Sequence, residues 1–442
     1  MPCRAPHSLP WPIPLPMTMQ TSTLSSAVEC GPSAAATGQK LPLGSLLALT
    51  MVSFIVILTE VLPAGLLPQL AASLHSSESV MGQLISVYAL GSVLAAIPLA
   101  AATQGVGRRT LLLTALAGFV TANTVTALST SLPLIFAARF VGGVAAGIAW
   151  SMLVGYAARM VPPHHKGRAI AITMAGTPLA LTVGIPAGTF IGNLMGWRFA
   201  FGVLSAMAAL LMAWIYFKLP ALRAERGAVR QRVLAVFVLP GVLPVLAVLL
   251  LYVVAHNILY TYIAPLATLA QLASRVDFLL ALFGGFALAG LLLVGVLVDR
   301  WLGRLVMASA ALFLCACAIL AAWPAGQAAM YVAVAVWGLA FGGVATLFVT
   351  ALSNAAGPAQ DVAQSMMTTV WNLAIFAGSV AGGMLLERFG AVSFAYAAIA
   401  ALSAALAIVW TTRTRAWWRG AAGRPGQQAA ASPTGTGAPA PR

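Results

Sequence analysis

Residues 46–70 read LLALTMVSFIVILTEVLPAGLLPQL, and this stretch decides the fold. It is long enough to cross a bilayer as a helix, because about 20 apolar residues cover the hydrocarbon core. Glu60 lies near its middle, where insertion scales assign a charge a cost of roughly 2.5–3.5 kcal/mol. A carboxylate at this depth faces the protein interior or a water-filled cavity by default. The stretch therefore predicts a membrane-spanning helix that carries a functional acid.

Composition extends this prediction to the whole chain. Of the 442 residues, 61% are hydrophobic and 7% are charged, whereas soluble domains carry about 25% charged residues. The formal charge of +15 does not predict nucleic-acid binding, because the basic residues cluster in short loops between apolar runs. We therefore expect a polytopic protein embedded in a lipid bilayer, with no nucleic-acid partner.

Polar side chains are too scattered to predict an enzyme or a metal site. Cys315 and Cys317 are two residues apart inside an apolar run, so on a helix they point to different faces. The chain has eight acidic residues and five histidines, without a catalytic cluster and without a G-x-x-x-x-G-K-[ST] phosphate loop. We expect no catalytic residue, no metal, no cofactor and no ATP-driven pump.

Apolar runs recur along the chain, and runs this continuous predict helices, because membrane β-barrels show short alternating segments. The predicted fold is an all-α membrane protein with twelve transmembrane helices in two pseudo-symmetric six-helix bundles. The expected spans are 44–70, 80–102, 109–130, 132–157, 168–193, 197–219, 233–258, 277–298, 304–323, 328–353, 363–386 and 391–412. The expected divisions are a disordered tail at 1–40, bundles at 41–219 and 233–412, a cytoplasmic linker at 220–232 and a disordered tail at 413–442.

Basic residues predict how the chain lies in the membrane. If both termini are cytoplasmic, the external loops keep only Arg198, Arg275 and Arg388. The cytoplasmic loops then hold Arg108, Arg109, Arg159, Lys166, Arg168, Arg223, Arg226, Arg230, Arg232, Arg300 and Arg304. The positive-inside rule therefore favours cytoplasmic termini. The Ala-, Gly- and Arg-rich composition suggests the inner membrane of a bacterium.

Short motifs repeat between the two halves. The sequence GGVA occurs at 142–145 and at 342–345, and a Gly-Arg turn occurs at Gly107-Arg108 and at Gly303-Arg304. Repeats about 195–200 residues apart in the same orientation predict parallel halves related by an axis along the membrane normal.

Several motifs stand in order on the expected spans. They are Thr59-Glu60-Val-Leu-Pro-Ala-Gly65-Leu-Leu-Pro68, Tyr88-Ala-Leu-Gly91, Gly107-Arg108-Arg109, Arg139-Phe-Val-Gly-Gly143-Val-Ala-Ala-Gly147, Gly184-Ile-Pro186-Ala-Gly188 and Asp299-Arg300. Over residues 44–412 the chain resembles the major facilitator superfamily, in its drug:proton antiporter type with twelve helices. The first two motifs look most like the sugar-efflux, arabinose-efflux and purine-ribonucleoside-efflux subgroup.

The resemblance implies moving parts. The glycine–proline motif characteristic of exporters supplies the expected hinge or seal, formed by Gly184, Pro186 and Gly188. Its chemistry is mechanical, because proline removes a backbone donor and glycine permits close helix packing. The expected cytoplasmic latch consists of Arg108, Arg109, Asp299 and Arg300. The first half departs from the superfamily pattern, because no acid precedes its Gly-Arg-Arg turn.

Glu60 and Arg139 are the candidate proton-coupling residues. Arg139 lies well inside span four, and Glu60 is the only acid at comparable depth in the first half, so we expect the two to pair. Burial favours the neutral acid while a nearby cation favours the carboxylate, so opening the pair switches protonation. The alternative is a permanently ionised structural pair.

Polar and aromatic residues inside the spans are the candidate substrate contacts. They are Tyr88, Asn123, His256, Asn257, Tyr260, Trp371 and Asn372. Each of these side chains is also of a type that packs or hydrogen-bonds between membrane helices without touching a ligand.

These features together predict a secondary active efflux transporter that exchanges protons for a small solute by alternating access. The solute is a sugar, a nucleoside or a drug, and a monomer suffices for the mechanism. The alternatives are a proton-independent uniporter and a transport-inactive membrane sensor of the same fold.

Overall fold

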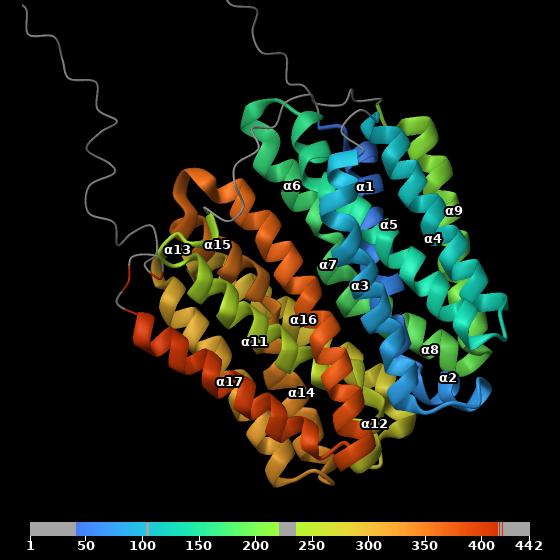
Figure 1. Ribbon diagram of the computed structural model, residues 1–442, viewed down its shortest axis with the longest axis vertical. Coiled ribbons are helices and arrows are strands. Elements are labelled where there is room, and N and C mark those ends of the chain that lie inside the picture. The colour runs from blue at the N-terminus through green and yellow to red at the C-terminus, as the bar shows by residue number, and fades with distance from the viewer. Residues whose placement is uncertain (1–40, 103–105, 221–235, 414, 416–417, 419–442) are drawn as a thin grey trace, which may run out of the picture. The chain divides into compact units, whose positions relative to one another are not determined.

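The structure, a computed structural model, describes residues 41–102, 106–220, 236–413, 415 and 418. Every regular element within these ranges is helical (Figure 1). The predicted tail at 1–40, the linker beyond Pro220 and most of the tail at 413–442 lie outside the described residues.

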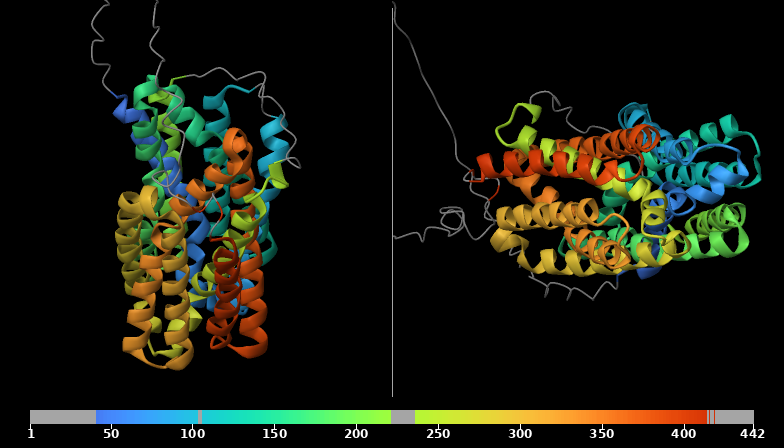
Figure 2. Two further views of the ribbon diagram at one scale, coloured as in Figure 1. Left: turned by 90° about the vertical axis from the view of Figure 1, so that its left-hand side faces the viewer. Right: turned by 90° about the horizontal axis from the view of Figure 1, so that it is seen from below.

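Helices fill both predicted bundles. The first half contains α1 (Leu43–Gly65), α2 (Leu67–Ser73), α3 (Glu78–Ala102), α4 (Arg108–Leu128), α5 (Leu132–Arg159), α6 (Lys166–Met174), α7 (Gly176–Leu179), α8 (Ile185–Met195) and α9 (Trp197–Lys218). The second half contains α11 (Val242–Thr261), α12 (Ile263–Leu269), α13 (Val276–Ala322), α14 (Gln327–Gly342), α15 (Val344–Ala356), α16 (Gln360–Phe389) and α17 (Ser393–Thr412). Figure 2 shows the blue-to-green first half against the yellow-to-red second half.

Eleven helical stretches of the described chain are long and apolar enough to cross a membrane. One of them, α13, covers two predicted spans, 277–298 and 304–323. Its backbone leaves the helical conformation between them, at Trp301. Phe283 and Phe313 are thirty residues apart on α13, which is about 45 Å along a straight helix. Both rings nevertheless pack on Trp337, with centroid distances of 4.8 and 5.7 Å. The chain therefore turns back at Trp301, and the twelve predicted membrane helices are confirmed.

The helix breaks at the ends of spans one and seven show the internal repeat. Leu67–Ser73 and Ile263–Leu269 are both seven-residue helices, and their numbering differs by 196 (263 − 67). Each is followed by a non-glycine residue with positive φ, His75 at 50° and Gln271 at 58°, and these also differ by 196. Matched breaks with a constant offset show that the two segments are counterparts.

Glycines bring the paired helices of each half into backbone contact. A Cβ on Gly143 of α5 would meet the Tyr88 carbonyl oxygen of α3, and a Cβ on Gly342 would meet the Ala287 carbonyl oxygen. The two residues of the second contact are each numbered 199 higher than their counterparts in the first (342 − 143 and 287 − 88). The repeated GGVA motif has an offset of 200, so the sequence match lies one residue out of the structural register. Gly147 faces the Ser92 carbonyl oxygen in the same way, so Gly143 and Gly147, four residues apart, form one close-packing face of α5.

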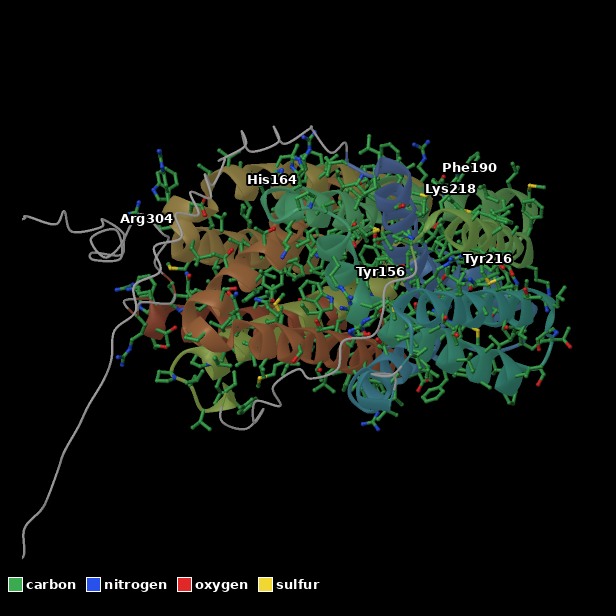
Figure 3. The ribbon with its side chains drawn as sticks, turned by 90° about the horizontal axis from the view of Figure 1, so that it is seen from above. Tyr156, His164, Phe190, Tyr216, Lys218 and Arg304 are labelled. Carbon is green, nitrogen blue, oxygen red and sulfur yellow. The ribbon has the colours of Figure 1, made fainter. Side chains whose placement is uncertain are left out.

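Hydrogen bonds join the two halves on the side opposite the basic turns. Gln83 at the start of α3 donates through Nε2 to the Tyr262 hydroxyl at 3.0 Å, and that hydroxyl donates to the Ser379 carbonyl at 2.9 Å. The Ser79 hydroxyl donates to the Gly383 carbonyl at 3.0 Å. Figure 3, seen from above, shows Tyr216 and Lys218 in the first half and Arg304 in the second.

Candidate functional site: a charged cluster and an aromatic cluster

Pro63 explains the local backbone around Glu60. A proline inside a helix has no N–H to give to the carbonyl four residues earlier, and for Pro63 that carbonyl belongs to Thr59. Arg139 of α5 supplies the missing donor, because its Nη1 lies 2.6 Å from the Thr59 carbonyl oxygen. Its Nη2 donates to the Glu60 carbonyl oxygen at 3.0 Å. The arginine therefore satisfies backbone that the proline leaves unpaired.

Each of the three guanidinium nitrogens of Arg139 donates to a backbone carbonyl oxygen. Its Nε donates to the Leu84 carbonyl oxygen at 3.4 Å, and its guanidinium lies over the Tyr88 ring with 4.6 Å to the centroid. Only 1% of its surface is exposed. We expected Arg139 to pair with the Glu60 carboxylate. The structure corrects this, because Arg139 donates to the Glu60 main-chain carbonyl and not to the carboxylate.

Glu60 keeps its carboxylate free. The residue is 4% exposed, and the described part of the chain gives its side chain neither an ion pair within 4.0 Å nor a hydrogen bond. The Arg139 charge still acts on it electrostatically. An acid that is buried, near a cation and without a partner is able to bind and release a proton.

Tyr88 and Asn123, two of the expected substrate contacts, surround this site within the first half. Both are 0% exposed. The Tyr88 hydroxyl donates to the Val56 carbonyl at 3.2 Å, and Asn123 Nδ2 donates to the Thr59 hydroxyl at 3.2 Å. We call Glu60, Arg139, Tyr88 and Asn123 the charged cluster.

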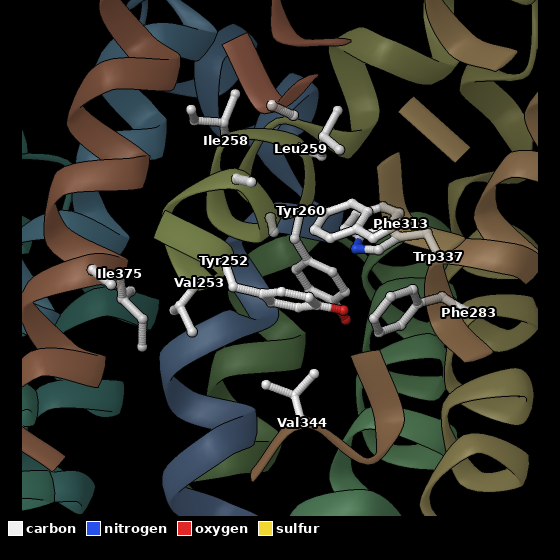
Figure 4. Packing of buried hydrophobic residues seen from close by; sticks show 14 of the residues in the cluster. Tyr252, Val253, Ile258, Leu259, Tyr260, Phe283, Phe313, Trp337, Val344 and Ile375 are labelled. Atoms are coloured by element: carbon white, nitrogen blue, oxygen red, sulfur yellow. The ribbon is translucent and has the colours of Figure 1, made fainter. Parts of the chain in front are cut away.

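An aromatic cluster occupies the second half, and we define it as His256, Tyr260, Phe283, Trp337 and Phe341. His256 stacks on Phe341 with 3.6 Å between ring centroids and an angle of 12°. Its ring also lies 5.0 Å from Tyr260 and 5.3 Å from Trp337. Figure 4 shows Tyr260, Phe283 and Trp337 converging on one region. The structure thus brings the predicted residues His256 and Tyr260 together with three rings that the sequence did not single out.

Three other predicted contacts lie around the aromatic cluster. The Trp371 ring is 6.3 Å from the Phe341 ring. Asn257 and Asn372 each donate to a carbonyl of their own helix, Val253 at 2.9 Å and Thr368 at 3.0 Å. These two amides are therefore engaged locally.

The predicted hinge coincides with a helix defect. Pro186 follows a π-helical turn at Ala180–Gly184, in which the Ile185 N–H bonds to the Ala180 carbonyl. Wide turns of this kind mark bends. Gly184 and Gly188 face Phe54 and Leu62 of α1, and Thr182 inside the turn donates to the Gly284 carbonyl of the other half at 3.1 Å.

The expected cytoplasmic latch is not assembled here. Arg109 lies over the Tyr216 ring at 5.0 Å within its own half, while Asp299 and Arg300 are exposed. Among the residues that the structure places, no ion pair joins Arg108 or Arg109 to Asp299.

A model of the Major Facilitator Superfamily matches residues 49–379. The chain belongs to that superfamily. It is therefore a multi-pass membrane transporter. The same family membership indicates a transporter and not an enzyme.

Solved structures of superfamily transporters share this fold at low sequence identity. One is the partially occluded inward-open xylose transporter XylE from E. coli, with a TM-score of 0.67, 15% identity and coverage of 84% of this chain and 99% of that one. A D-xylose–proton symporter has a TM-score of 0.68, 17% identity and coverage of 84% and 97%. The nucleoside transporter NupG, in a mutant form, has a TM-score of 0.66, 14% identity and coverage of 84% and 99%. At these identities the likeness concerns the fold alone.

Proposed function

We propose that this transporter is a secondary active exporter that exchanges external protons for a small neutral solute, with Glu60 as the proton carrier. The observation that carries the proposal is the state of the Glu60 carboxylate, which is buried and unpaired while Arg139 is held by backbone carbonyls. A permanently ionised structural acid inside a membrane would need a partner at its side chain.

Arg139 then acts on Glu60 in two ways. It holds the main-chain carbonyls of Thr59 and Glu60, one on each side of the Glu60 Cα, and its charge stabilises the carboxylate without neutralising it by contact. Protonation of Glu60 removes a charge from a site of low dielectric constant. The neutral and charged forms therefore favour different arrangements of the two halves, which is the requirement for coupling.

Movement between these arrangements uses the contacts between the halves. Opening toward the side of Gln83 and Tyr262 breaks the two hydrogen bonds that Gln83 Nε2 donates across the halves, to the Tyr262 hydroxyl and to the Ser379 carbonyl. The π-helical turn before Pro186 meets the other half at Thr182 and Gly284, so bending there alters the contact directly. The proposed direction of transport, export, rests on the glycine–proline motif. The proposed cytoplasmic position of both termini rests on the basic turns.

Everted membrane vesicles test this proposal. With an imposed proton gradient, addition of the transported solute should dissipate the gradient in native vesicles and leave it intact with Glu60→Gln, because the amide cannot carry the proton. Glu387→Gln is the matched control, since Glu387 is exposed, and it should behave as the native protein.

Solute-driven proton movement that survives in Glu60→Gln would exclude Glu60 as the carrier. Solute exchange that is equal in native and Glu60→Gln vesicles and independent of the gradient would identify a uniporter. Binding without exchange would identify a sensor.

A further inference from the structure

We propose that the aromatic cluster is the solute-binding site, and that it takes a neutral, ring-shaped, hydroxylated solute of the monosaccharide class. This rests on the proposed function, since it assigns to the second half the solute that the first half exchanges for protons.

The first argument is the set of polar atoms that the cluster leaves unpaired. Among described residues, six buried side-chain polar atoms have no hydrogen-bond partner, and three of them are His256 Nδ1, the Tyr260 hydroxyl and Trp337 Nε1. Their rings lie 5.0–5.9 Å apart between centroids. Buried polar groups in native proteins are normally hydrogen-bonded, so each exception requires an explanation. Three exceptions around one region are explained by a polar ligand that contacts all of them.

The second argument is position within the internal repeat. The offset of 196 that relates α2 to α12 takes Glu60 to His256. The offset of 199 that relates the glycine contacts takes Leu84, whose carbonyl receives Arg139, to Phe283. The aromatic cluster therefore lies in the second half at the place that the charged cluster occupies in the first.

The two counterparts differ in what they leave available. In the second half the positions of Arg139 and Tyr88 are taken by Gly338 and Ala287 (offset 199). In place of the cation and its ring partner, aromatic side chains gather around this position, Trp337 and Phe283 among them. One half thus presents an acid for a proton, and the other presents rings and neutral polar groups for a solute.

The chemistry of the cluster selects the solute. None of its five members is a carboxylate or a permanent cation, so it offers no counter-charge to an ionic solute. Trp337 Nε1 is only a donor and requires an acceptor oxygen or nitrogen. His256 and Phe341 already stack face to face at 3.6 Å, which leaves no slot between them for a flat base. A sugar ring, with hydroxyls at its edge and C–H groups on its face, satisfies both requirements.

Binding to the purified full-length protein in lipid nanodiscs tests the assignment. The probes are radiolabelled D-glucose, D-xylose, uridine and tetraphenylphosphonium. Tyr260→Phe removes one polar atom and keeps its ring, and Trp337→Phe removes the indole N–H and keeps a smaller ring. Each should raise the Kd of the bound sugar about tenfold, since a buried hydrogen bond is lost. The melting temperature of Tyr260→Phe without sugar should stay equal or rise, because the hydroxyl removed has no partner in the protein.

Tyr396→Phe and Trp410→Phe are the matched controls, because both residues are exposed, at 58% and 57%. They should leave sugar binding unchanged. Unchanged sugar affinity in both Tyr260→Phe and Trp337→Phe would overturn the site, and binding of uridine or the cation in place of the sugars would overturn the solute class.

The outcome is separable from that of the proposed function. Proton-coupled export that is unaffected by Tyr260→Phe and Trp337→Phe would refute the site and leave the exporter standing. Sugar binding that depends on both residues, in a protein whose proton gradient no sugar dissipates, would confirm the site and refute the exporter.

Discussion

At the scale of single residues, the membrane arginine acts through the backbone. Pro63 frees the Thr59 carbonyl, and Arg139 donates to it and to the Glu60 carbonyl. The carboxylate of Glu60 therefore remains available although a guanidinium is nearby. A proline and an arginine that are distant in the sequence thus form one functional unit with the acid between them.

This relationship predicts a compensating pair of substitutions. Arg139→Gln should lower stability strongly, because each buried carbonyl left unpaired costs about 1–3 kcal/mol. Pro63→Ala restores an N–H for the Thr59 carbonyl, so the double variant should recover about 1 kcal/mol relative to the sum of the single effects. Thermal unfolding in detergent measures the cycle. Strictly additive effects would show that the two residues do not share the carbonyl.

Sequence reasoning reached Glu60 and Arg139 but not the manner of their contact. A buried acid and a buried arginine suggest an ion pair, and only the coordinates show which carbonyl Pro63 frees. Trp337 was missed because a tryptophan within an apolar span has the appearance of core packing. Tyr88 and Asn123 are candidate substrate contacts by residue type, whereas the helix rotation that places them inside the first half is not readable from hydropathy.

At the scale of elements, glycine decides how closely helices approach. Gly143 and Gly342 lie against carbonyl oxygens of the neighbouring helix, while Gly155 and Gly285 have open space where a Cβ would be. The four-residue spacing of Gly143 and Gly147 is a sequence signal for such a face, because close helix packing in membranes requires small residues at that interval.

Alanine substitutions should distinguish the closely packed glycines from the open ones by their effect on stability. Gly143→Ala and Gly342→Ala should destabilise the protein by at least 1–3 kcal/mol, roughly the cost of overpacking, because the neighbouring backbone must move. Gly155 lies on α5 together with Gly143, and Gly285 lies on α13, the helix that Gly342 contacts. Gly155→Ala and Gly285→Ala should be neutral or slightly stabilising. Melting temperatures in detergent decide the matter, and equal effects in both pairs would contradict the packing argument.

At the scale of the whole molecule, two pseudo-symmetric halves carry different chemistry at equivalent places. The number of spans and the division into halves follow from hydropathy and basic turns, because the bilayer sets helix length and the side on which charges remain. The specialisation of the halves does not follow from hydropathy, because Glu60 and His256 correspond only once the helix breaks at Leu66 and Tyr262 are seen.

The most direct test of proton coupling through Glu60 is a count of the protons released when the sugar that binds is added to purified protein in weakly buffered solution. Measured across pH with an indicator dye, native protein and Glu387→Gln should release up to about one proton per molecule, and Glu60→Gln should release none. Equal release from native protein and Glu60→Gln would contradict the account.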